Sequence, residues 1–459
     1  DLVGVPVVLL DAMRPTLRTM VDLRLGHLSL DRSVGTLSDG ELQRLRLARQ
    51  LHLGLSGVTY VLDEPTGGLH ARDVGRLMQH LRSLRAEGNT IVIVEHRPDV
   101  LRAADRIIEL GPGPGPQGGR VIAHGTASSV LAGDSPTAIA LRKFACTSPG
   151  ISAPLTVSIC RAKLNNLKSI DVRIPGAGLV VVTGVSGSGK STLVRGVIEA
   201  SARAARPVGC MSVTGLDGFD HIVSAYGVTY TSMDTVLTVA KLLLPLKRLF
   251  AAAAAQAGLS AASLSHRSPA GRCPACKGAG HDRVHMDFVA DVLVPCEVCA
   301  GGRYLPEVLA LRASGVSLRD VLHSPMADLV ARLDSGPIAE VMNAFVQLGL
   351  GYLTLGRSAS TISGGERQRV VLASRLVARP GRSLIILDEP GRGSHELDIV
   401  RLVGVLRKLA DRGDLVLAVA HRQSVVRGAD YVVEMGPEGG PEGGTVVYSG
   451  VRRQVTQTR

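Results

Sequence analysis

Residues 179–192 read LVVVTGVSGSGKST, and this stretch decides the fold class of the chain. The apolar run at 179–182 predicts a buried strand, and a glycine-rich turn leads from it into a helix. Glycines in such a turn let successive backbone N–H groups point toward one anion, and the helix adds the positive end of its dipole. The stretch therefore predicts a phosphate-binding loop on an α/β sheet.

The side chains of this loop predict its chemistry. Lys190 is expected to neutralise charge on the β- and γ-phosphates of a nucleotide, and the Ser191 hydroxyl is expected to bind Mg²⁺. A glycine-rich turn can match such a pattern by chance, but the strand before it and the partner motifs after it favour nucleotide binding. The expected nucleotide-binding residues of the loop are Gly184, Ser186, Gly187, Ser188, Gly189, Lys190, Ser191 and Thr192.

Composition limits the class of protein. The 459 residues suffice for two or three domains, and 45% of them are hydrophobic, which indicates a globular chain. No stretch approaches the ~18–20 apolar residues that span a bilayer, so we expect a cytoplasmic protein without a membrane partner. The net charge of +12 suits a polyanionic partner, although solvated basic faces are a common alternative. An aromatic content of 3% with no Trp disfavours recognition by base stacking.

Two apolar runs end in a pair of adjacent carboxylates. The run at 58–62 is followed by Asp63 and Glu64, and a run in the second half is followed by Asp388 and Glu389. Nucleotide hydrolases use carboxylates at the ends of strands to hold Mg²⁺ and to polarise the attacking water. We therefore predict strands at both places, with the acidic pairs at their carboxyl ends.

Two turns of small polar residues and glycines precede a helical pattern, TLSDGE at 36–41 and TISGGE at 361–366. Such a helix N-terminus can bind an anion, although an ordinary capped helix has the same pattern. His96 follows an apolar strand candidate at 90–94, and His421 has the same place in the second half, where each could contact a γ-phosphate or be structural. Because the turns, carboxylates and histidines recur at a constant offset of 325 positions, we predict a duplicated ATPase unit. The first copy has no phosphate loop in this chain.

About 170 residues separate the phosphate loop from the second turn, more than a compact ATPase core needs, so we expect an inserted module there. The module contains two CxxC pairs with 19 residues between them, each beside a glycine-containing turn. Two thiolate pairs at this spacing fit a tetrahedral Zn²⁺ site. The predicted ligands are Cys273, Cys276, Cys296 and Cys299, whereas His281, His285, Cys146, Cys160 and Cys210 are expected to be ordinary residues.

The order of these motifs is similar to that in the nucleotide-binding domains of the ABC ATPases. The duplication and the inserted cysteine module resemble the UvrA family, the damage-recognition ATPases of bacterial nucleotide excision repair, or a close paralogue of it. The stretches that carry the resemblance include VLDEPTGGLH, TGVSGSGKSTL, RCPACKGAG and TISGGERQRV, and they spread over most of residues 20–440. The resemblance implies a duplicated P-loop ABC-type α/β fold with an inserted zinc-binding module, of which further family segments would precede Asp1.

The expected domains follow from this resemblance. They are the C-terminal lobe of a first ABC unit without a P-loop at 1–145, the P-loop lobe of a second unit at 155–210, an inserted signature and zinc module at 211–345, and the signature and Walker B lobe of the second unit at 346–459. Residues 135–154 are expected to form the linker between the two units.

The resemblance also implies how the sites are used. ATP would bind between two half-units, with Glu389, Lys190 and His421 as catalytic residues and Asp388 on Mg²⁺. Residues of the first unit, namely Ser38, Gly40 and Glu41, would close this site. The implied cofactors are ATP, Mg²⁺ and Zn²⁺. The implied partners are damaged double-stranded DNA, the other excinuclease subunits and a second copy of the chain.

Several positions depart from the family pattern. Asp39 replaces a glycine of the first turn, and Ala420 replaces the acidic residue before His421. A glutamine expected near Ser224 has no clear counterpart in HIVSAYGVTY, and a Gly-Leu-His turn reads GSH at 393–395. These changes bear on the rate of hydrolysis more than on nucleotide binding.

Other functions remain open from the sequence. One alternative is a paralogue that gives self-resistance to DNA-binding drugs, and another is a truncated, inactive fragment. A transporter ATPase fits worst, because a zinc insertion has no use there. Basic residues around the cysteine turns are candidate DNA contacts or a solvated rim, namely Arg272, Lys277, Arg283 and Arg303.

Overall fold

The computed structural model of the chain describes residues 7–451, apart from short segments between them. The positions outside the described set are 1–6, 24, 27, 35–36, 38–41, 43, 46, 50–55, 67–68, 70, 114–117, 143–154, 226–230, 232, 285–291, 334–335, 377–380, 392–393 and 452–459. The chain divides into two compact units. The first comprises Asp1–Glu109, Val121–Ser224 and Gly381–Arg459, and the second comprises Leu110–Arg120 and Ala225–Pro380.

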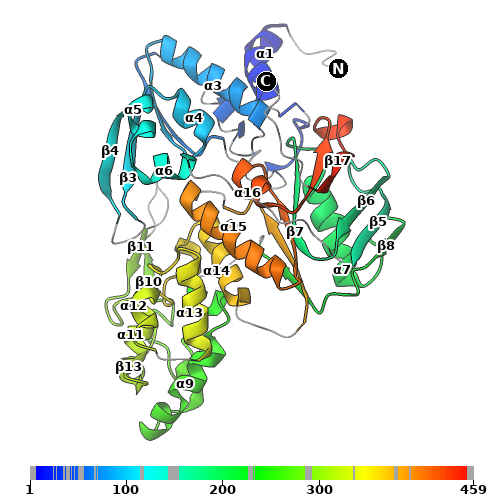
Figure 1. Cartoon of the computed structure of the whole chain (residues 1–459). Coiled ribbons are helices and arrows are strands. Elements are labelled where there is room, and N and C mark those ends of the chain that lie inside the picture. The colour runs from blue at the N-terminus through cyan, green and yellow to red at the C-terminus, as the bar shows by residue number, and fades with distance from the viewer. Residues whose placement is uncertain are drawn as a thin grey trace. The chain divides into compact units, whose positions relative to one another are not determined.

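A six-stranded sheet with the order β17-β16-β7-β15-β14-β9 organises the first unit (Figure 1). Its strands are β7 (Gly178–Gly184), β9 (His221–Ser224), β14 (Ser383–Asp388), β15 (Leu415–Val419), β16 (Tyr431–Gly436) and β17 (Thr445–Val451). All neighbours pair in parallel except β17, which is antiparallel to β16 at the edge. The apolar residues of β7 and β15 are fully buried, as expected for parallel strands covered on both faces. The strand predicted at 179–182 is thereby confirmed.

Helices and a smaller sheet surround this core. Helix α15 (Glu396–Asp411) packs on β7 and β15, and α16 (Gln423–Gly428) packs on β7. The phosphate loop leads into η3 (Thr192–Glu199), which continues into α7 (Ala200–Ala204). The remaining elements are an antiparallel sheet of β5 (Thr156–Ala162), β6 (Ile170–Pro175) and β8 (Ser212–Thr214), and the short helix η6 (Gly440–Glu442).

The first copy of the repeat forms two small sheets in the same unit. Strands β1 (Thr59–Asp63) and β2 (Thr90–Val94) pair in parallel, which confirms the strands predicted at 58–62 and 90–94. Strands β3 (Arg106–Gly111) and β4 (Arg120–Thr126) form the second sheet. The helices of this copy are α1 (Val7–Asp22), α3 (Ala71–Ala86), α4 (Pro98–Ala103), α5 (Ala127–Ala132) and α6 (Pro136–Arg142).

Helix α6 corrects one expectation. The linker predicted at 135–154 begins with this helix, and its later residues, 143–154, lie outside the described set. Proline at the first position of a helix is favourable, and Ala138 and Ala140 are buried. The composition of this segment predicted a linker. Its first part is instead a helix that packs on α15.

The second unit is mainly helical and carries the four cysteines. Its helices are α8 (Val236–Val239), α9 (Leu243–Gln256), η4 (Ala261–Leu264), α10 (Pro306–Ala310), α11 (Leu318–His323), α12 (Met326–Val330), α13 (Pro337–Gln347), η5 (Ala359–Thr361) and α14 (Gly364–Leu376). Its strands form two hairpins, β10 (His281–Val284) with β11 (Val292–Pro295) and β12 (Arg312–Ala313) with β13 (Val316–Ser317).

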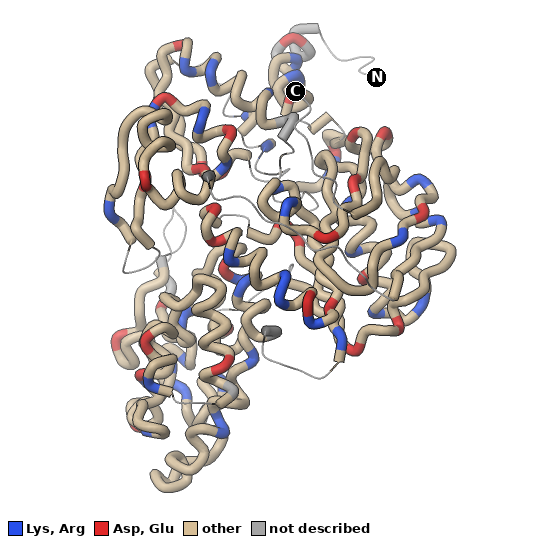
Figure 2. Tube along the Cα trace, viewed as in Figure 1, with Lys and Arg blue, Asp and Glu red and all other residues tan. Residues whose placement is uncertain are grey.

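Charge is interspersed in both units. Lys, Arg, Asp and Glu are scattered along the described chain instead of gathering in one segment (Figure 2). Among the described helices, none combines the length and the apolar character that crossing a membrane requires.

Candidate nucleotide site and metal centre

The predicted phosphate loop lies between the end of β7 and the start of η3. Gly184 has a φ of +134°, and a Cβ at this position would come within 2.0 Å of the Met435 carbonyl oxygen. Gly189 has a φ of +96°, and a Cβ there would come within 2.9 Å of Leu167 Cδ2. Both positive φ values favour glycine, and at Gly184 the neighbouring backbone also leaves no room for a side chain.

Other segments of the same unit hold the loop from outside. Asn166 Nδ2 donates to the Gly187 carbonyl oxygen at 2.9 Å, and Gly440 N–H donates to the same oxygen at 3.0 Å. Among the described residues, the buried Ser188 hydroxyl has no hydrogen-bond partner. The loop is therefore held in place by hydrogen bonds and buries a hydroxyl that could donate to a ligand. Both features fit the binding of a phosphate group.

Lys190 folds back over this loop. Its buried ammonium donates to the carbonyl oxygens of Gly184, at 3.1 Å, and Val185, at 2.6 Å. A positive charge at this place would also attract a bound anion such as a phosphate. The loop and Lys190 together fit the phosphates of a nucleotide.

The predicted carboxylates and histidine meet at the carboxyl edge of the same sheet. Because β15 lies between β7 and β14, the ends of these three strands are adjacent, which is where ligands bind in open parallel sheets. Asp388 ends β14, and Glu389 follows it with a φ of +48°. His421 follows β15, and its Nε2 lies 3.0 Å from Glu389 Oε1. A non-glycine residue in the left-handed region is uncommon, and such residues cluster at functional sites.

Arg195, on η3, joins this edge, although no motif in the sequence marks it. Its Nη2 forms an ion pair with Asp388 Oδ2. From sequence, Arg195 is one more basic residue on a helix, and only the fold brings it to Asp388. By donor chemistry, the Ser191 hydroxyl and the Asp388 carboxylate are the oxygen ligands that Mg²⁺ accepts, so the residues fit this ion.

The first copy repeats the geometry of the strand ends. Glu64 has a φ of +44°, and its N–H donates to the Val94 carbonyl oxygen at 2.9 Å. The equivalent Glu389 N–H donates to Val419 at 2.8 Å. His96 Nε2 lies 3.6 Å from Glu64 Oε1, as His421 lies beside Glu389. The repeat predicted from the constant offset is therefore also a repeat of backbone conformation.

Residues of the first copy contact the second copy within this unit. The buried Arg44 donates from Nη2 to the Ser186 hydroxyl of the phosphate loop at 3.3 Å. Arg44 follows the first predicted turn, whose residues Ser38, Gly40 and Glu41 lie outside the described set. The contact brings the helical segment after that turn to the phosphate loop.

A second contact between the copies centres on His395. Its ring meets the His96 ring edge to face, with centroids 6.2 Å apart, and its Nε2 lies 2.7 Å from the Thr137 hydroxyl. Its Nδ1 accepts a hydrogen bond from Leu397 N–H at 3.3 Å, which caps α15. Burial lowers the pKa of His395, and the charge of His96 lowers it further.

The second turn caps α14 in the second unit. Ser363 N–H donates to Glu366 Oε2 at 2.6 Å, and Glu366 N–H donates to the Ser363 hydroxyl at 3.2 Å, which is a reciprocal capping box. Burial acts to raise the pKa of Glu366, but hydrogen bonds from Tyr352 and Ser363 keep it below its usual value. The glutamate of this turn therefore stabilises the helix start, as in the alternative of an ordinary capped helix.

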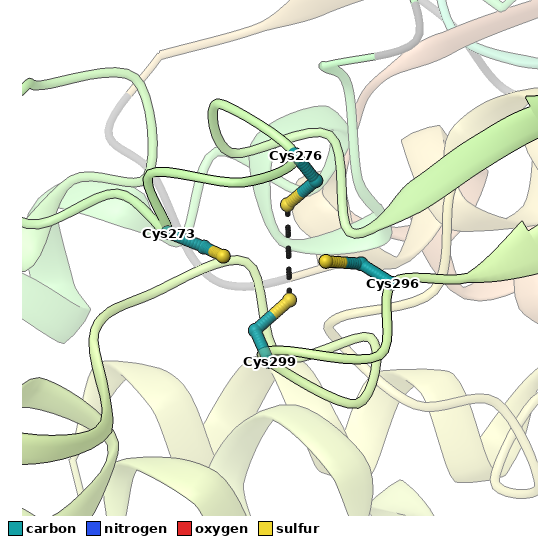
Figure 3. Close-up of side chains that lie close together, drawn as sticks. All are labelled: Cys273, Cys276, Cys296 and Cys299. Atoms are coloured by element: carbon teal, nitrogen blue, oxygen red, sulfur yellow. Dashed lines mark hydrogen bonds between the residues drawn. The ribbon is translucent and has the colours of Figure 1, made fainter.

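The four predicted cysteines converge on one point in the second unit (Figure 3). Their Sγ atoms all lie within 4.8 Å of one another, and those of Cys276 and Cys299 are 3.7 Å apart. Tetrahedral zinc with Zn–S bonds of about 2.3 Å would place its sulfurs about 3.8 Å apart. Without a cation, burial raises the pKa of Cys299 to about 12, so a metal is what would stabilise its thiolate. The cluster fits Zn²⁺.

Backbone hydrogen bonds to the cysteine sulfurs also support a metal site, and the burial of Arg303 contradicts its predicted contact with DNA. Gly280 N–H donates to Cys276 Sγ at 3.2 Å, and Arg303 N–H donates to Cys299 Sγ at 3.4 Å. The Arg303 side chain is buried and donates to the Gly278 carbonyl oxygen at 3.3 Å. The prediction that Arg303 lies on an exposed rim and contacts DNA is therefore wrong, because the cysteine turns bury its side chain.

The other three basic candidates differ from Arg303. Lys277 is exposed and Arg272 is half-buried, whereas nothing is described of the Arg283 side chain. Two of the four candidate DNA contacts therefore remain at the surface.

Comparison with known proteins matches almost the whole chain to UvrABC system protein A. The protein of Bacillus subtilis (strain 168) is 41% identical over 452 residues, which cover 94% of this chain and 47% of that protein. The protein of Streptomyces avermitilis is 43% identical over 459 residues, which cover 96% of this chain and 45% of that protein. The chain is UvrA-like. It spans about half the length of these UvrA relatives.

Solved structures agree with the sequence match to UvrA. UvrA2 from Deinococcus radiodurans superimposes with a TM-score of 0.87 at 36% identity, covering 98% of this chain and 57% of that one. The archaeal ribosome recycling factor aABCE1 gives a TM-score of 0.52 at 18% identity, covering 99% of this chain and 69% of that one, and shows the fold alone. No protein-family model matches the chain. The predicted ABC-type α/β fold is confirmed.

Proposed function

We propose that the chain binds and hydrolyses ATP and serves damage recognition in an excision nuclease. The observation that carries the proposal is the phosphate loop at the end of β7, with Asp388, Glu389 and His421 at the adjoining strand ends. Sequence identity of 41% with UvrABC system protein A over 452 residues supports it. The name of those relatives also supports other subunits of that system as partners.

In this proposal the site residues of the second copy have separate roles. Lys190 and the loop amides bind the β- and γ-phosphates, and Ser191 and Asp388 hold Mg²⁺, which neutralises phosphate charge when bound. Glu389 orients the attacking water and accepts hydrogen bonds from it. His421, at 3.0 Å from Glu389, holds that carboxylate in place and faces the γ-phosphate.

The first copy closes the same site. The hydrogen bond from Arg44 to Ser186 supports this role, since it brings the segment after the first turn to the phosphate loop. Ser38, Gly40 and Glu41 would contact the γ-phosphate from that side. Asp63, Glu64 and His96 form the equivalent strand ends of the first copy, which has no phosphate loop in this chain.

The cysteine cluster and the two basic residues beside it, Lys277 and Arg272, serve DNA binding. Cys273, Cys276, Cys296 and Cys299 hold Zn²⁺ and thereby fix the turns that present Lys277 and Arg272. Recognition of damage without a fixed sequence rests on phosphate contacts and on how easily the duplex deforms. Damaged double-stranded DNA is the proposed ligand, and a second copy of the chain is the proposed partner in a homodimer.

The test is ATP turnover by the zinc-loaded chain with and without damaged duplex. We expect turnover that rises with damaged DNA and is lost in Lys190→Ala. Lys163→Ala removes an exposed lysine of the same charge and is the matched control. Unchanged turnover in Lys190→Ala would contradict the proposal.

One observation favours a second candidate, a paralogue that binds drug-modified DNA. Ser224 stands near the position where the family pattern has glutamine, and its hydroxyl is hydrogen-bonded to Glu199 and to Arg203, the latter at 2.7 Å. This side chain therefore supports α7 instead of facing a nucleotide. A preference for intercalated over ultraviolet-damaged duplex, measured across salt concentrations, would favour the paralogue.

A further inference from the structure

Arg195 places a protein cation on the carboxylate that is proposed to hold Mg²⁺. Its guanidinium reaches from η3 to Asp388 Oδ2, and both side chains are only partly exposed. The helix is wound with i→i+5 hydrogen bonds at this point, since Ala200 N–H donates to the Arg195 carbonyl oxygen. Such π-type winding is rare and is found often at functional sites.

Arg195 is charged at neutral pH and forms an ion pair with Asp388. Burial lowers the pKa of Arg195 and the neighbouring Glu199 opposes this, and a guanidinium stays protonated at neutral pH in either case. Glu199 is itself bound by Arg203, whose Nε lies 2.8 Å from Glu199 Oε1. Arg203 thus satisfies Glu199, whereas Arg195 is paired with Asp388.

We propose that Arg195 is a built-in competitor of the divalent metal at Asp388. A charge-assisted pair between guanidinium and carboxylate is among the stronger side-chain contacts, and it uses oxygen lone pairs that a metal requires. The guanidinium also repels a second cation close to the same carboxylate. Nucleotide binding at this loop then depends on Mg²⁺ less than it would with a free Asp388. The inference rests on the proposed function of the loop.

The experiment measures how strongly Mg²⁺ and nucleotide binding are coupled, without any turnover. The affinity of a fluorescent, non-hydrolysable ATP analogue is measured once in EDTA and once in excess Mg²⁺, and the ratio of the two dissociation constants is the coupling. Arg195→Ala and Arg195→Gln remove the charge, the second while retaining most of the side chain. Arg206→Ala removes an equal charge from an exposed side chain just after α7 and leaves Glu199 paired with Arg203, and thermal unfolding checks that each variant is folded.

We expect both Arg195 variants to raise the coupling ratio by roughly threefold to tenfold, because Asp388 is released to the metal. Arg206→Ala should leave the ratio unchanged. A ratio that is unchanged or lower in folded Arg195 variants would overturn the inference and leave the proposed nucleotide site standing. No binding of the analogue by the wild-type chain in either condition would overturn the nucleotide site, and this inference with it.

Discussion

The two copies of the ATPase unit agree at their strand ends and differ in the middle of their sheets. In the second copy β7 lies between β15 and β16 and joins them in one six-stranded sheet, beside the separate sheet of β5, β6 and β8. In the first copy β1-β2 and β3-β4 form separate two-stranded sheets, and no strand in the described part of the chain joins them. The strand that carries the phosphate loop is therefore also the strand that unites the sheet.

Equivalent residues of the two copies also differ in burial. Val61 is 68% exposed, whereas its equivalent Ile386 is fully buried at 0%. Ile108 is 70% exposed, and its equivalent Val433 is likewise at 0%. The two copies keep the same apolar pattern, but only the second copy has described elements that cover it. The predicted phosphate loop and the more fully covered sheet thus occur in the same copy.

The largest expected difference between the copies is in catalysis. Glu389→Gln should lower ATP turnover by about 10²–10⁴-fold, because it removes the proposed water-polarising carboxylate. Glu64→Gln is the matched change in the first copy and should alter turnover by less than about twofold. Steady-state turnover at saturating ATP is the measurement. Equal losses in both variants would show that the two copies contribute alike.

The next largest difference is in stability. Ile386→Ala should lower the free energy of unfolding by about 2–5 kcal/mol, because it leaves a cavity in a packed sheet. Val61→Ala, at the equivalent exposed position, should change it by no more than about 0.5 kcal/mol. Urea unfolding followed by circular dichroism measures both. A loss above about 1 kcal/mol for Val61→Ala would mean that this face is covered in solution.

The smallest expected effect concerns the contact between the copies at His395. Burial and the charge of His96 lower the pKa of His395 in the fold, so the unfolded chain takes up this proton more readily. The stability that neutral His395 contributes is thus fully present above its unfolded pKa, near about 6.5, and is lost as the pH falls below it. His395→Asn keeps a capping side chain that does not titrate.

The measurement is the free energy of unfolding between about pH 7.5 and about pH 5.5, the range in which histidine titrates. The wild-type chain should lose more stability across this range than His395→Asn. The opposite order would contradict the lowered pKa.

The sequence predicted those parts of the site that rest on local pattern. The glycine-rich loop, the strand ends at Asp388 and Glu389, and the paired cysteines each lie within short stretches whose residues dictate their own conformation. The strands at 58–62 and 90–94 were equally readable from their apolar runs. The repeat offset then linked the two copies without any structure.

The remainder depended on contacts between distant segments. Arg195 meets Asp388, and Arg44 meets Ser186, only because the fold brings their elements together. Arg303 has the composition of a surface residue and is buried by the turns of the cysteine cluster. Helix α6 was not predicted, because the composition of its own segment does not show that it packs on α15. In each case tertiary contacts overrode the local signal.

The number of nucleotides bound per chain tests the central difference between the copies most directly. Equilibrium dialysis with a non-hydrolysable ATP analogue in Mg²⁺ should give one nucleotide per 459-residue chain, lost in Lys190→Ala and retained in Lys163→Ala. Two nucleotides per chain, or one that persists in Lys190→Ala, would contradict the assignment of the site to the second copy.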